Sequence, residues 1–425
     1  MEQFSERLRR SSEWTLSLYA GMAAFACYFC MYGFRKPFTA AEFAGIGWLS
    51  SEITLKTALL ISQTLGYTIS KYAGIIICSE TRPGWRATGL VILILIAEAA
   101  LILFAILPDD WRVLAIFLNG LPLGMVWGFV ARYLEGRRTS DLLYLAMSCS
   151  IILASAFVKD MGRMFLVAGI SEWWMPAVTG LTFLVPFLVS VWMLDQLPPP
   201  RPQEEALRTR RVSMSSSDRR TFFQDLMVPL CLFFAANMLL TAFRDFRDNF
   251  GIEVLSNLGY AETPALFSRT EIPITLAVLA TFGMFSLIQN DRLNFSLLIG
   301  TMTFGTVLMG GATWLFQEHR LSGLWWMGLT GLGAFLAYIP LNAIIFDRII
   351  SLYGKAATAV FAIYIADATG YTVTVGLLFY KDLFAAGLSR EEYLQQLTYA
   401  TSVFGSIAIV TAGILMLRRT WIRDH

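Results

Sequence analysis

Residues 87–107 read ATGLVILILIAEAALILFAIL, an apolar stretch whose single charged side chain is Glu98. A bilayer with a hydrocarbon core about 30 Å thick is crossed by about 20 apolar residues in a helix. The stretch therefore predicts a transmembrane helix. Similar segments recur along the chain and give twelve expected spans, at 14–35, 54–77, 87–107, 111–131, 142–168, 174–194, 222–247, 269–288, 295–316, 322–346, 357–380 and 393–417.

The composition of the whole chain points the same way. Of its 425 residues, 56% are hydrophobic and only 15% are charged, whereas roughly a quarter of an average soluble domain is charged. The strands of a membrane barrel would be about ten residues long with alternating polarity, and these segments are longer and do not alternate. We therefore expect an all-α, polytopic membrane protein with twelve transmembrane helices.

The sequence offers little for metal or redox chemistry. It has only two histidines, His319 in a short loop and His425 at the end of the chain. All five cysteines lie within apolar runs, and the spacing Cys27-x-x-Cys30 has no neighbours that would complete a site. We interpret the cysteines as small buried side chains, and we expect no metal and no cofactor.

A polar stretch divides the twelve segments into two groups of six. Residues 195–221 are first proline-rich and then basic and rich in serine, which is typical of flexible linkers. We predict an N-terminal half at 1–194, this cytoplasmic linker, and a C-terminal half at 222–425. The loops on the same side of the membrane as the two termini contain roughly three times as many arginines and lysines as the loops on the opposite side. The positive-inside rule assigns the arginine-rich side to the cytoplasm. We therefore expect a multi-pass protein of the inner membrane with both ends cytoplasmic.

The first helices of the two halves share a pattern. Residues 25–35, FACYFCMYGFR, and residues 234–244, FAANMLLTAFR, both begin with Phe-Ala and end with Phe-Arg. Arg35 and Arg244 are therefore expected at the same depth of their helices. The match favours a duplicated half, and transporters built from repeats have their substrate site near the membrane centre where the repeats meet.

Charged side chains occur inside several predicted spans, where each costs about 2.5–3.5 kcal/mol on insertion scales. Some could be structural, since Asp160 and Arg163 have the i,i+3 spacing of a helical ion pair. Arg35, Lys71 and Arg244 favour a second interpretation, in which three cations surround one cavity and attract an anion such as a phosphate or a carboxylate. The planar guanidinium group of arginine matches two oxygens of such an anion at once.

Five short segments lie in matching order on the predicted helices: 32–38 (YGFRKPF), 66–72 (GYTISKY), 120–127 (GLPLGMVW), 237–244 and 338–340 (YIP). They resemble segments of the major facilitator superfamily. Within it, they are similar to the bacterial organophosphate/phosphate antiporters, such as the glycerol-3-phosphate and hexose-phosphate transporters. The resemblance implies two six-helix bundles and alternating access to a cationic central site.

By the same resemblance, the two arginines would clamp the phosphate group of the substrate from the two halves, with the lysine of the second helix assisting. The predicted substrate-binding residues are Arg35, Lys71, Arg244, Tyr32, Trp127 and Lys36. The expected partners are a small anionic molecule and the lipid bilayer, without nucleic acid, and the short loops favour a monomer.

The chain also departs from these antiporters. Residues 148–150, SCS, stand where the antiporters have a histidine in the fifth helix. Further charged residues are predicted to serve in coupling or in charge pairs, namely Asp160, Lys159, Arg163, Asp367 and Asp248. Two alternatives stay open: a proton-coupled transporter of a zwitterionic or carboxylate solute, and a membrane lipid-handling protein or enzyme. Since no catalytic constellation or nucleotide loop is recognisable, we do not expect an enzyme.

Overall fold

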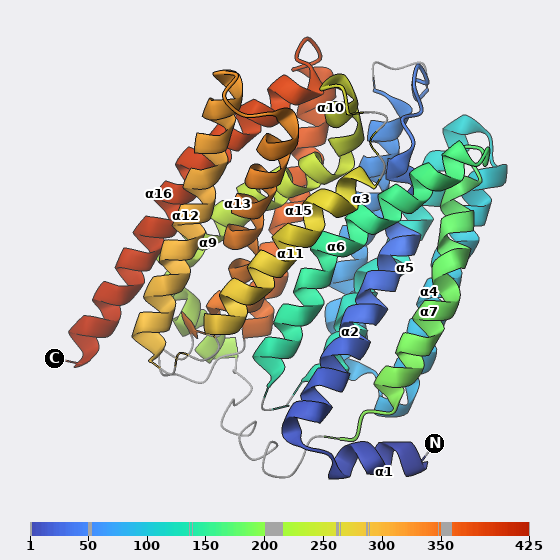
Figure 1. Ribbon diagram of the computed structural model, residues 1–425. Coiled ribbons are helices and arrows are strands. Elements are labelled where there is room, and N and C mark those ends of the chain that lie inside the picture. Colours follow the sequence, from blue (N-terminus) through green and yellow to red (C-terminus); the bar gives the residue numbers. More distant parts are fainter. Residues whose placement is uncertain are drawn as a thin grey trace. The chain divides into compact units, whose positions relative to one another are not determined.

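The computed structural model describes residues 2–49, 53–135, 137, 139–199, 216–260, 263, 265–285, 288, 290–346, 348–349 and 359–424. Within these ranges the chain is built from α-helices joined by short connections (Figure 1). The predicted all-α class is therefore confirmed.

A helix lies at the position of each predicted span. These helices are α2 (Glu13–Arg35), α3 (Leu55–Glu80), α4 (Arg86–Ile106), α5 (Asp109–Leu134), α6 (Ser140–Val167), α7 (Met175–Asp195), α9 (Ser216–Asn249), α11 (Leu266–Phe285), α12 (Asp291–Gln317), α13 (Gly323–Ala343), α15 (Ala359–Leu383) and α16 (Arg390–Asp424).

Among the described residues, nine helices are long and apolar enough to cross a membrane. The other three, α3, α11 and α15, stay predictions as spans. In α3 the polarity has a visible cause, because Lys56, Gln63 and Lys71 interrupt its apolar residues.

Several helices begin where a side chain caps the N–H groups of the first turn, which have no partner within the helix. Ser12 accepts a hydrogen bond from the N–H of Thr15 at the start of α2, and Thr54 accepts one from Thr57 at the start of α3. Asn290 accepts two backbone N–H groups at the start of α12. These caps explain why the observed helices begin within a few residues of the hydropathy boundaries.

Within the described residues, four short elements lie outside the predicted spans. They are α1 (Glu2–Arg10), the 3-10 turns η1 (Pro37–Ala40) and η2 (Pro83–Trp85), and α10 (Gly251–Asn257). Hydropathy could not find them, because they are short or, like α1, strongly charged.

The chain forms two compact units. The first contains Met1–Pro200, Asn249–Thr275 and Val375–Gly387. The second contains Arg201–Asp248, Leu276–Thr374 and Leu388–His425. Residues 200–215, most of the predicted linker, lie outside the described residues. The division into an N-terminal half, a linker and a C-terminal half therefore stays a prediction.

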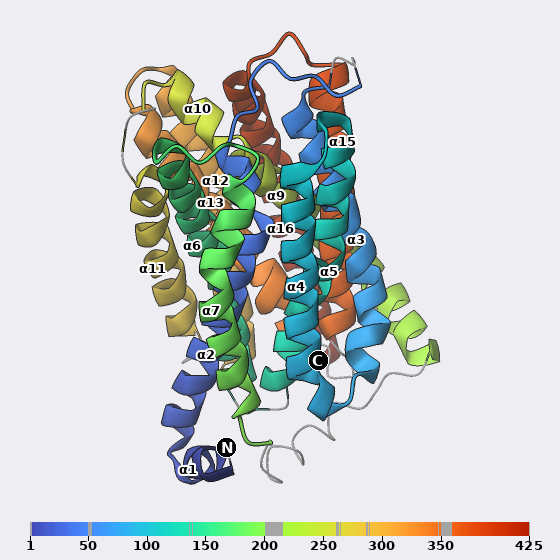
Figure 2. The same ribbon diagram turned by 90° about the vertical axis from the view of Figure 1, so that its right-hand side faces the viewer.

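In the first unit, α3 and α5 pack along one another (Figure 2). Two glycines permit the close approach: a Cβ atom at Gly66 would meet the carbonyl oxygen of Phe117, and one at Gly120 would meet that of Gln63. Helix α2 packs against α6 and α7, and also contacts α5. The end of α2 and the middle of α3 are thereby held beside α5.

In the second unit, α12 packs against α13 and α16 (Figure 1). Trp326 of α13 is fully buried and stacks on Phe316 of α12 with ring centroids 4.5 Å apart. Its indole N–H donates to Thr313 at 3.0 Å, so this large side chain is buried with its polar group satisfied.

The burial of the cysteines is predicted correctly except at one position. Cys27, Cys30, Cys78 and Cys149 are buried, whereas Cys231 of α9 is exposed. The expectation for Cys231 is wrong because a membrane helix can be apolar on all sides. Polarity alone therefore does not distinguish an inward from an outward position.

Candidate functional site

Two of the predicted cations meet at one aromatic ring in the first unit. Arg35 is the last residue of α2 and Lys71 lies in the second half of α3, and both are buried. The guanidinium carbon of Arg35 lies 3.9 Å from the centroid of the Tyr67 ring, and Lys71 Nζ lies 5.3 Å from the same centroid. Both distances are those of cation–π contacts. The structure therefore brings Arg35 and Lys71 together.

Two further predicted residues complete this group. The ring of Tyr32, one turn before Arg35, lies 5.6 Å from its guanidinium carbon. Trp127 of α5 lies with its ring 5.3 Å from Lys71 Nζ. We refer to Tyr32, Arg35, Tyr67, Lys71 and Trp127 as the first-unit cluster.

Buried amides fix the backbone around the cluster. Gln63 Nε2 donates to the carbonyl oxygen of Arg35 at 2.7 Å and to Asn119 Oδ1 at 2.8 Å. Asn119 Nδ2 donates to the carbonyl oxygens of Phe34 at 3.1 Å and Ala97 at 3.0 Å. The carbonyls at the end of α2, which have no partner within the helix, are thereby bonded to α3 and α5.

Sequence reasoning missed three residues of this region. Tyr67, Gln63 and Asn119 were not predicted to belong to the site. The first two could have been found from spacing, because Gln63, Tyr67 and Lys71 follow one another at intervals of four and share one face of α3. Nothing in the sequence of α5 singles out Asn119.

Arg244, the second predicted arginine, lies in the second unit with different neighbours. It donates to Asp245 Oδ1 through Nε at 3.2 Å and through an Nη atom at 2.7 Å. Its guanidinium carbon lies 4.2 Å from the ring centroid of Tyr338, and the Tyr371 hydroxyl lies 3.5 Å from an Nη atom. Asp367 of α15 interacts electrostatically with Tyr338. We refer to these five residues as the second-unit cluster.

The amide of Asn237, seven residues before Arg244, joins helices of the second unit. Its Nδ2 donates to the carbonyl oxygen of Ala366 at 2.8 Å, and its Oδ1 accepts from Asn342 at 3.0 Å. These bonds connect α9 with α15 and α13. Asn237 thus has a scaffolding role like that of Asn119 in the first unit.

Three other predicted residues lie where α2 and α6 contact the segment from the end of α9 to the start of α11. Lys36 Nζ donates to Asn249 Oδ1 at 2.7 Å. Asp160 accepts the backbone N–H groups of residues 267 and 268 at 3.3 and 2.7 Å, in the first turn of α11, where the helix dipole favours a negative charge. Lys159 Nζ lies 4.5 Å from the ring centroid of Phe267.

An ion pair missed by sequence reasoning strengthens the same contact. Lys56 Nζ at the start of α3 lies 2.6 Å from Glu253 Oε1 of α10, and both side chains are almost fully buried. Lys56 also donates to the carbonyl oxygen of Thr39 at 3.1 Å. The predicted residues Arg163, Asp248 and Asp367 are half-buried, and their roles in coupling stay predictions.

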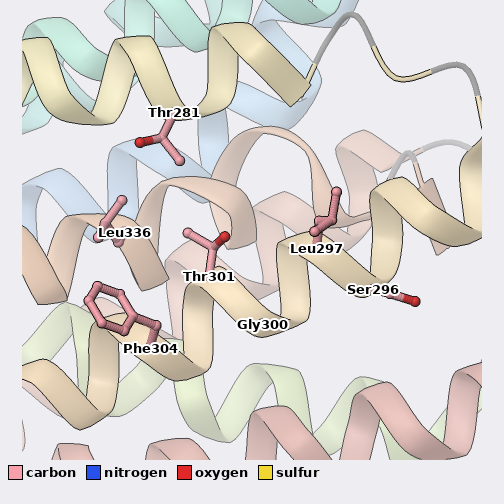
Figure 3. Close-up of a pocket in the computed structure, with 7 residues that line it drawn as sticks. All are labelled: Thr281, Ser296, Leu297, Gly300, Thr301, Phe304 and Leu336. Atoms are coloured by element: carbon pink, nitrogen blue, oxygen red, sulfur yellow. The ribbon is translucent and has the colours of Figure 1, made fainter.

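A pocket in the second unit lies apart from all predicted residues (Figure 3). It has a volume of about 380 Å³ and lies between α11, α12 and α13, with Thr281, Thr301 and Leu336 in its wall. Phe304 at its edge is 59% exposed. With no charged side chain in its lining, the pocket suits an apolar group better than an anion.

The fold resembles solved structures of major facilitator transporters. A D-xylose-proton symporter matches with a TM-score of 0.60 at 13% identity, covering 95% of this chain and 97% of that one. The nucleoside transporter NupG matches with a TM-score of 0.57 at 13% identity over 94% and 99% of the two chains. A bacterial homologue of the human drug peptide transporters matches with a TM-score of 0.60 at 11% identity over 96% and 100%.

At these identities the likeness shows the fold alone. Together with the long apolar helices, it identifies a multi-pass membrane protein with a transporter fold. No curated protein matches the sequence. The model of a family described as "Family of unknown function (DUF5690)" matches residues 37–419, and the chain belongs to this family.

Proposed function

We propose that this member of the DUF5690 family is a secondary active transporter that moves a small organic anion, with phosphorylated compounds as the preferred class. Two findings support the proposal. The fold is that of transporters for small solutes. The observation that carries the anionic preference is the placement of Arg35 and Lys71 on the ring of Tyr67.

The burial of two cations beside one ring is unfavourable in the absence of an anion. Two buried positive charges repel each other, and they interact more strongly at low effective dielectric than in water. A phosphate or carboxylate that binds both groups replaces this repulsion by attraction. The guanidinium group supplies a planar pair of donors and the ammonium group a point charge, so the two can hold different oxygens of one anion. The aromatic rings contact both cations through cation–π interactions.

The second-unit cluster bears on which solute can bind. In the predicted clamp, Arg244 contacts the substrate together with Arg35. Asp245 is bonded to Arg244, so an anion that binds Arg244 competes with this carboxylate. A solute that also carries an amino group would find an acceptor in Asp245 or Asp367. This observation favours, as second candidate, a proton-coupled transporter of a zwitterionic solute.

The membrane, the topology and the mechanism are proposed from the sequence and its resemblance. The transporter lies in the inner membrane as a monomer with both termini cytoplasmic. It works by alternating access, and it exchanges its organic anion for inorganic phosphate.

A thermal-shift screen of the purified protein in detergent tests the substrate class. The compounds are organic phosphates, carboxylates, amino acids and uncharged sugars, all at equal ionic strength. Organic phosphates are expected to raise the melting temperature because only the folded protein binds them. Stabilisation by uncharged sugars alone would contradict the proposal, and stabilisation by amino acids alone would favour the second candidate.

A further inference from the structure

Glu98 is a buried carboxyl group that the proposed substrate site does not use. It lies in the middle of α4, the most apolar of the candidate spans. Its side chain is 4% exposed, and both carboxyl oxygens are buried without a hydrogen-bond partner. Burial of an ionised carboxylate in this situation is strongly unfavourable unless a partner compensates its charge.

Helix α7 leaves room for the carboxyl group. Oε2 of Glu98 lies against the backbone at Gly180, where a Cβ atom would overlap it, and the Phe34 ring of α2 borders the same place. Any residue larger than glycine at 180 would displace the carboxyl group. On the side of α7, the carboxyl group therefore faces a glycine backbone and an aromatic ring, and neither compensates a negative charge.

The charged groups of the helices packed against α4 lie at helix ends or have other contacts. They are Glu13 at the start of α2, Arg35 on Tyr67, Asp109 and Asp110 at the start of α5, Arg112 on Trp173, Arg132 with Glu135, and Asp195 at the end of α7. On α4 itself, Arg86 donates to the carbonyl oxygen of residue 132. The short turn η2 carries no charge. The remaining titratable side chains of α2 and α5 are thiols and phenols, which are neutral near pH 7.

We propose that Glu98 is a reversible proton-binding site that holds the proton in the conformation described here. A proton from water adds to one carboxylate oxygen and removes the charge, so the buried group becomes a neutral acid. On release, the same oxygen–hydrogen bond breaks and the proton returns to water, when a rearrangement gives the carboxylate access to solvent.

The position of Glu98 connects this proton with the first-unit cluster. Asn119 holds the carbonyl of Ala97, the neighbour of Glu98, together with that of Phe34. Gln63 links Asn119 to the carbonyl of Arg35. A shift of α4 on protonation therefore acts on the backbone that carries Arg35. Where it concerns transport, the inference rests on the proposed function, and protonation of Glu98 is then coupled to the exchange of the anions.

Infrared spectroscopy of the purified, full-length protein tests the proton site without any substrate. A protonated carboxylic acid has a carbonyl stretching band that is well separated from the bands of a carboxylate. The spectrum of the wild type minus that of Glu98→Gln is expected to contain this band at neutral pH. The band is expected to be lost as the pH is raised and to return when it is lowered.

Glu253→Gln is the matched control, because Glu253 is also buried but is paired with Lys56. Its difference spectrum is expected to show carboxylate bands only. If Glu98→Gln folds poorly, Glu98→Asp takes its place in the comparison. This variant keeps a carboxylic acid and should show an acid band at a shifted frequency. Two results would overturn the proposal. The first is a Glu98 difference spectrum without the acid band, and the second is an acid band that does not respond to pH while the protein stays folded.

Transport in proteoliposomes tests the coupling, with inorganic phosphate and glycerol 3-phosphate as probes. An imposed proton gradient is expected to accelerate uptake by the wild type several-fold, and this acceleration should be lost in Glu98→Gln, while exchange at equal pH persists. Equal acceleration of uptake by the wild type and by Glu98→Gln would contradict a role of Glu98 in coupling protons to transport. If neither probe moves in any variant, the proposed exchange of organic phosphate for inorganic phosphate fails, whereas the infrared result still decides the proton site.

Discussion

Arg35 and Arg244 end the same eleven-residue pattern in two helices, yet their surroundings differ. Arg35 lies on the ring of Tyr67 beside a second cation, Lys71. Arg244 lies on the ring of Tyr338 beside a carboxylate bonded at 2.7 Å. In both units the arginine faces a tyrosine ring, but this ring is shared with a second cation in the first unit, whereas the arginine of the second unit is bonded to a carboxylate.

The difference separates two roles for the same residue. Side-chain amides tie each arginine helix to its neighbours, through Gln63 and Asn119 in the first unit and Asn237 and Asn342 in the second. The scaffold is thus similar, while the charge beside the arginine differs. We infer that the first-unit cluster supplies most of the affinity for an anion, and that Arg244 also has a structural role.

The largest effect is expected from breaking the pair of Arg244 and Asp245. Asp245→Ala leaves a buried arginine without its carboxylate, and removal of one partner from a buried pair costs about 3–5 kcal/mol of folding free energy. The double variant Arg244→Met, Asp245→Ala should recover much of this loss. Thermal unfolding in detergent measures the loss of stability in the single variant and its recovery in the double variant.

The matched control is the partly exposed pair of Arg348 and Asp291, with an N–O distance of 2.9 Å. Asp291→Ala should cost at most about 1 kcal/mol, because exposed pairs are weak. Equal losses at the two pairs would contradict the structural role of Arg244.

The next effect concerns anion affinity. Arg35→Lys removes the planar donor pair and should weaken binding of an organic phosphate about 100-fold, or roughly 2.8 kcal/mol. Arg112→Lys is the control, because Arg112 also lies on an aromatic ring, with its guanidinium carbon 3.5 Å from the centroid of Trp173, but outside the cluster. Titration calorimetry compares the two. A similar loss of affinity in both variants would point to a general effect on the fold.

A smaller effect is expected at the second cation. Lys71→Met keeps the length of the side chain but removes its charge, and it should weaken anion binding about tenfold, or roughly 1.4 kcal/mol. Lys71→Arg should retain most of the affinity. The same titration, repeated at low and high salt, should show a weaker salt dependence for the methionine variant. Unchanged affinity in Lys71→Met would remove the lysine from the site.

The smallest effect is expected from the shared ring. Tyr67→Leu removes a cation–π partner worth about 1 kcal/mol, so anion affinity should fall about fivefold, whereas Tyr67→Phe keeps the ring and the affinity. Tyr338→Leu, the corresponding change in the second unit, should alter anion affinity less than Tyr67→Leu does. A larger loss of anion affinity in Tyr338→Leu than in Tyr67→Leu would contradict the roles inferred for the two clusters.

Helix positions could be predicted closely from the sequence, because a span must be long and apolar. Residues 87–107, for example, coincide with α4 (Arg86–Ile106) to within a residue. The proximity of Arg35 and Lys71 was also expected, both from the charges inside the predicted spans and from the resemblance. Tyr67 could have been added from its helical spacing to Lys71.

Contacts between distant segments could not be predicted in this way. The place of Lys36 at the substrate stays a prediction, and the bond between its amine and Asn249, 213 residues away, was not foreseen. The pair of Lys56 and Glu253 likewise joins helices far apart in the chain. Such contacts depend on how helices pack, and neither hydropathy nor local spacing contains this information. For the same reason, the sequence shows that Glu98 is an ionisable residue within a span but not that its oxygens lack hydrogen-bond partners.

Counterflow in proteoliposomes tests the central claim most directly. Vesicles that contain the purified protein are loaded with unlabelled glycerol 3-phosphate and diluted into a trace of the labelled compound, and an empty-vesicle control defines leakage. We predict rapid, transient accumulation of label by the wild type and none above leakage by Arg35→Ala. No accumulation by folded wild-type protein with this or any other organic anion, or equal accumulation by Arg35→Ala, would contradict the account.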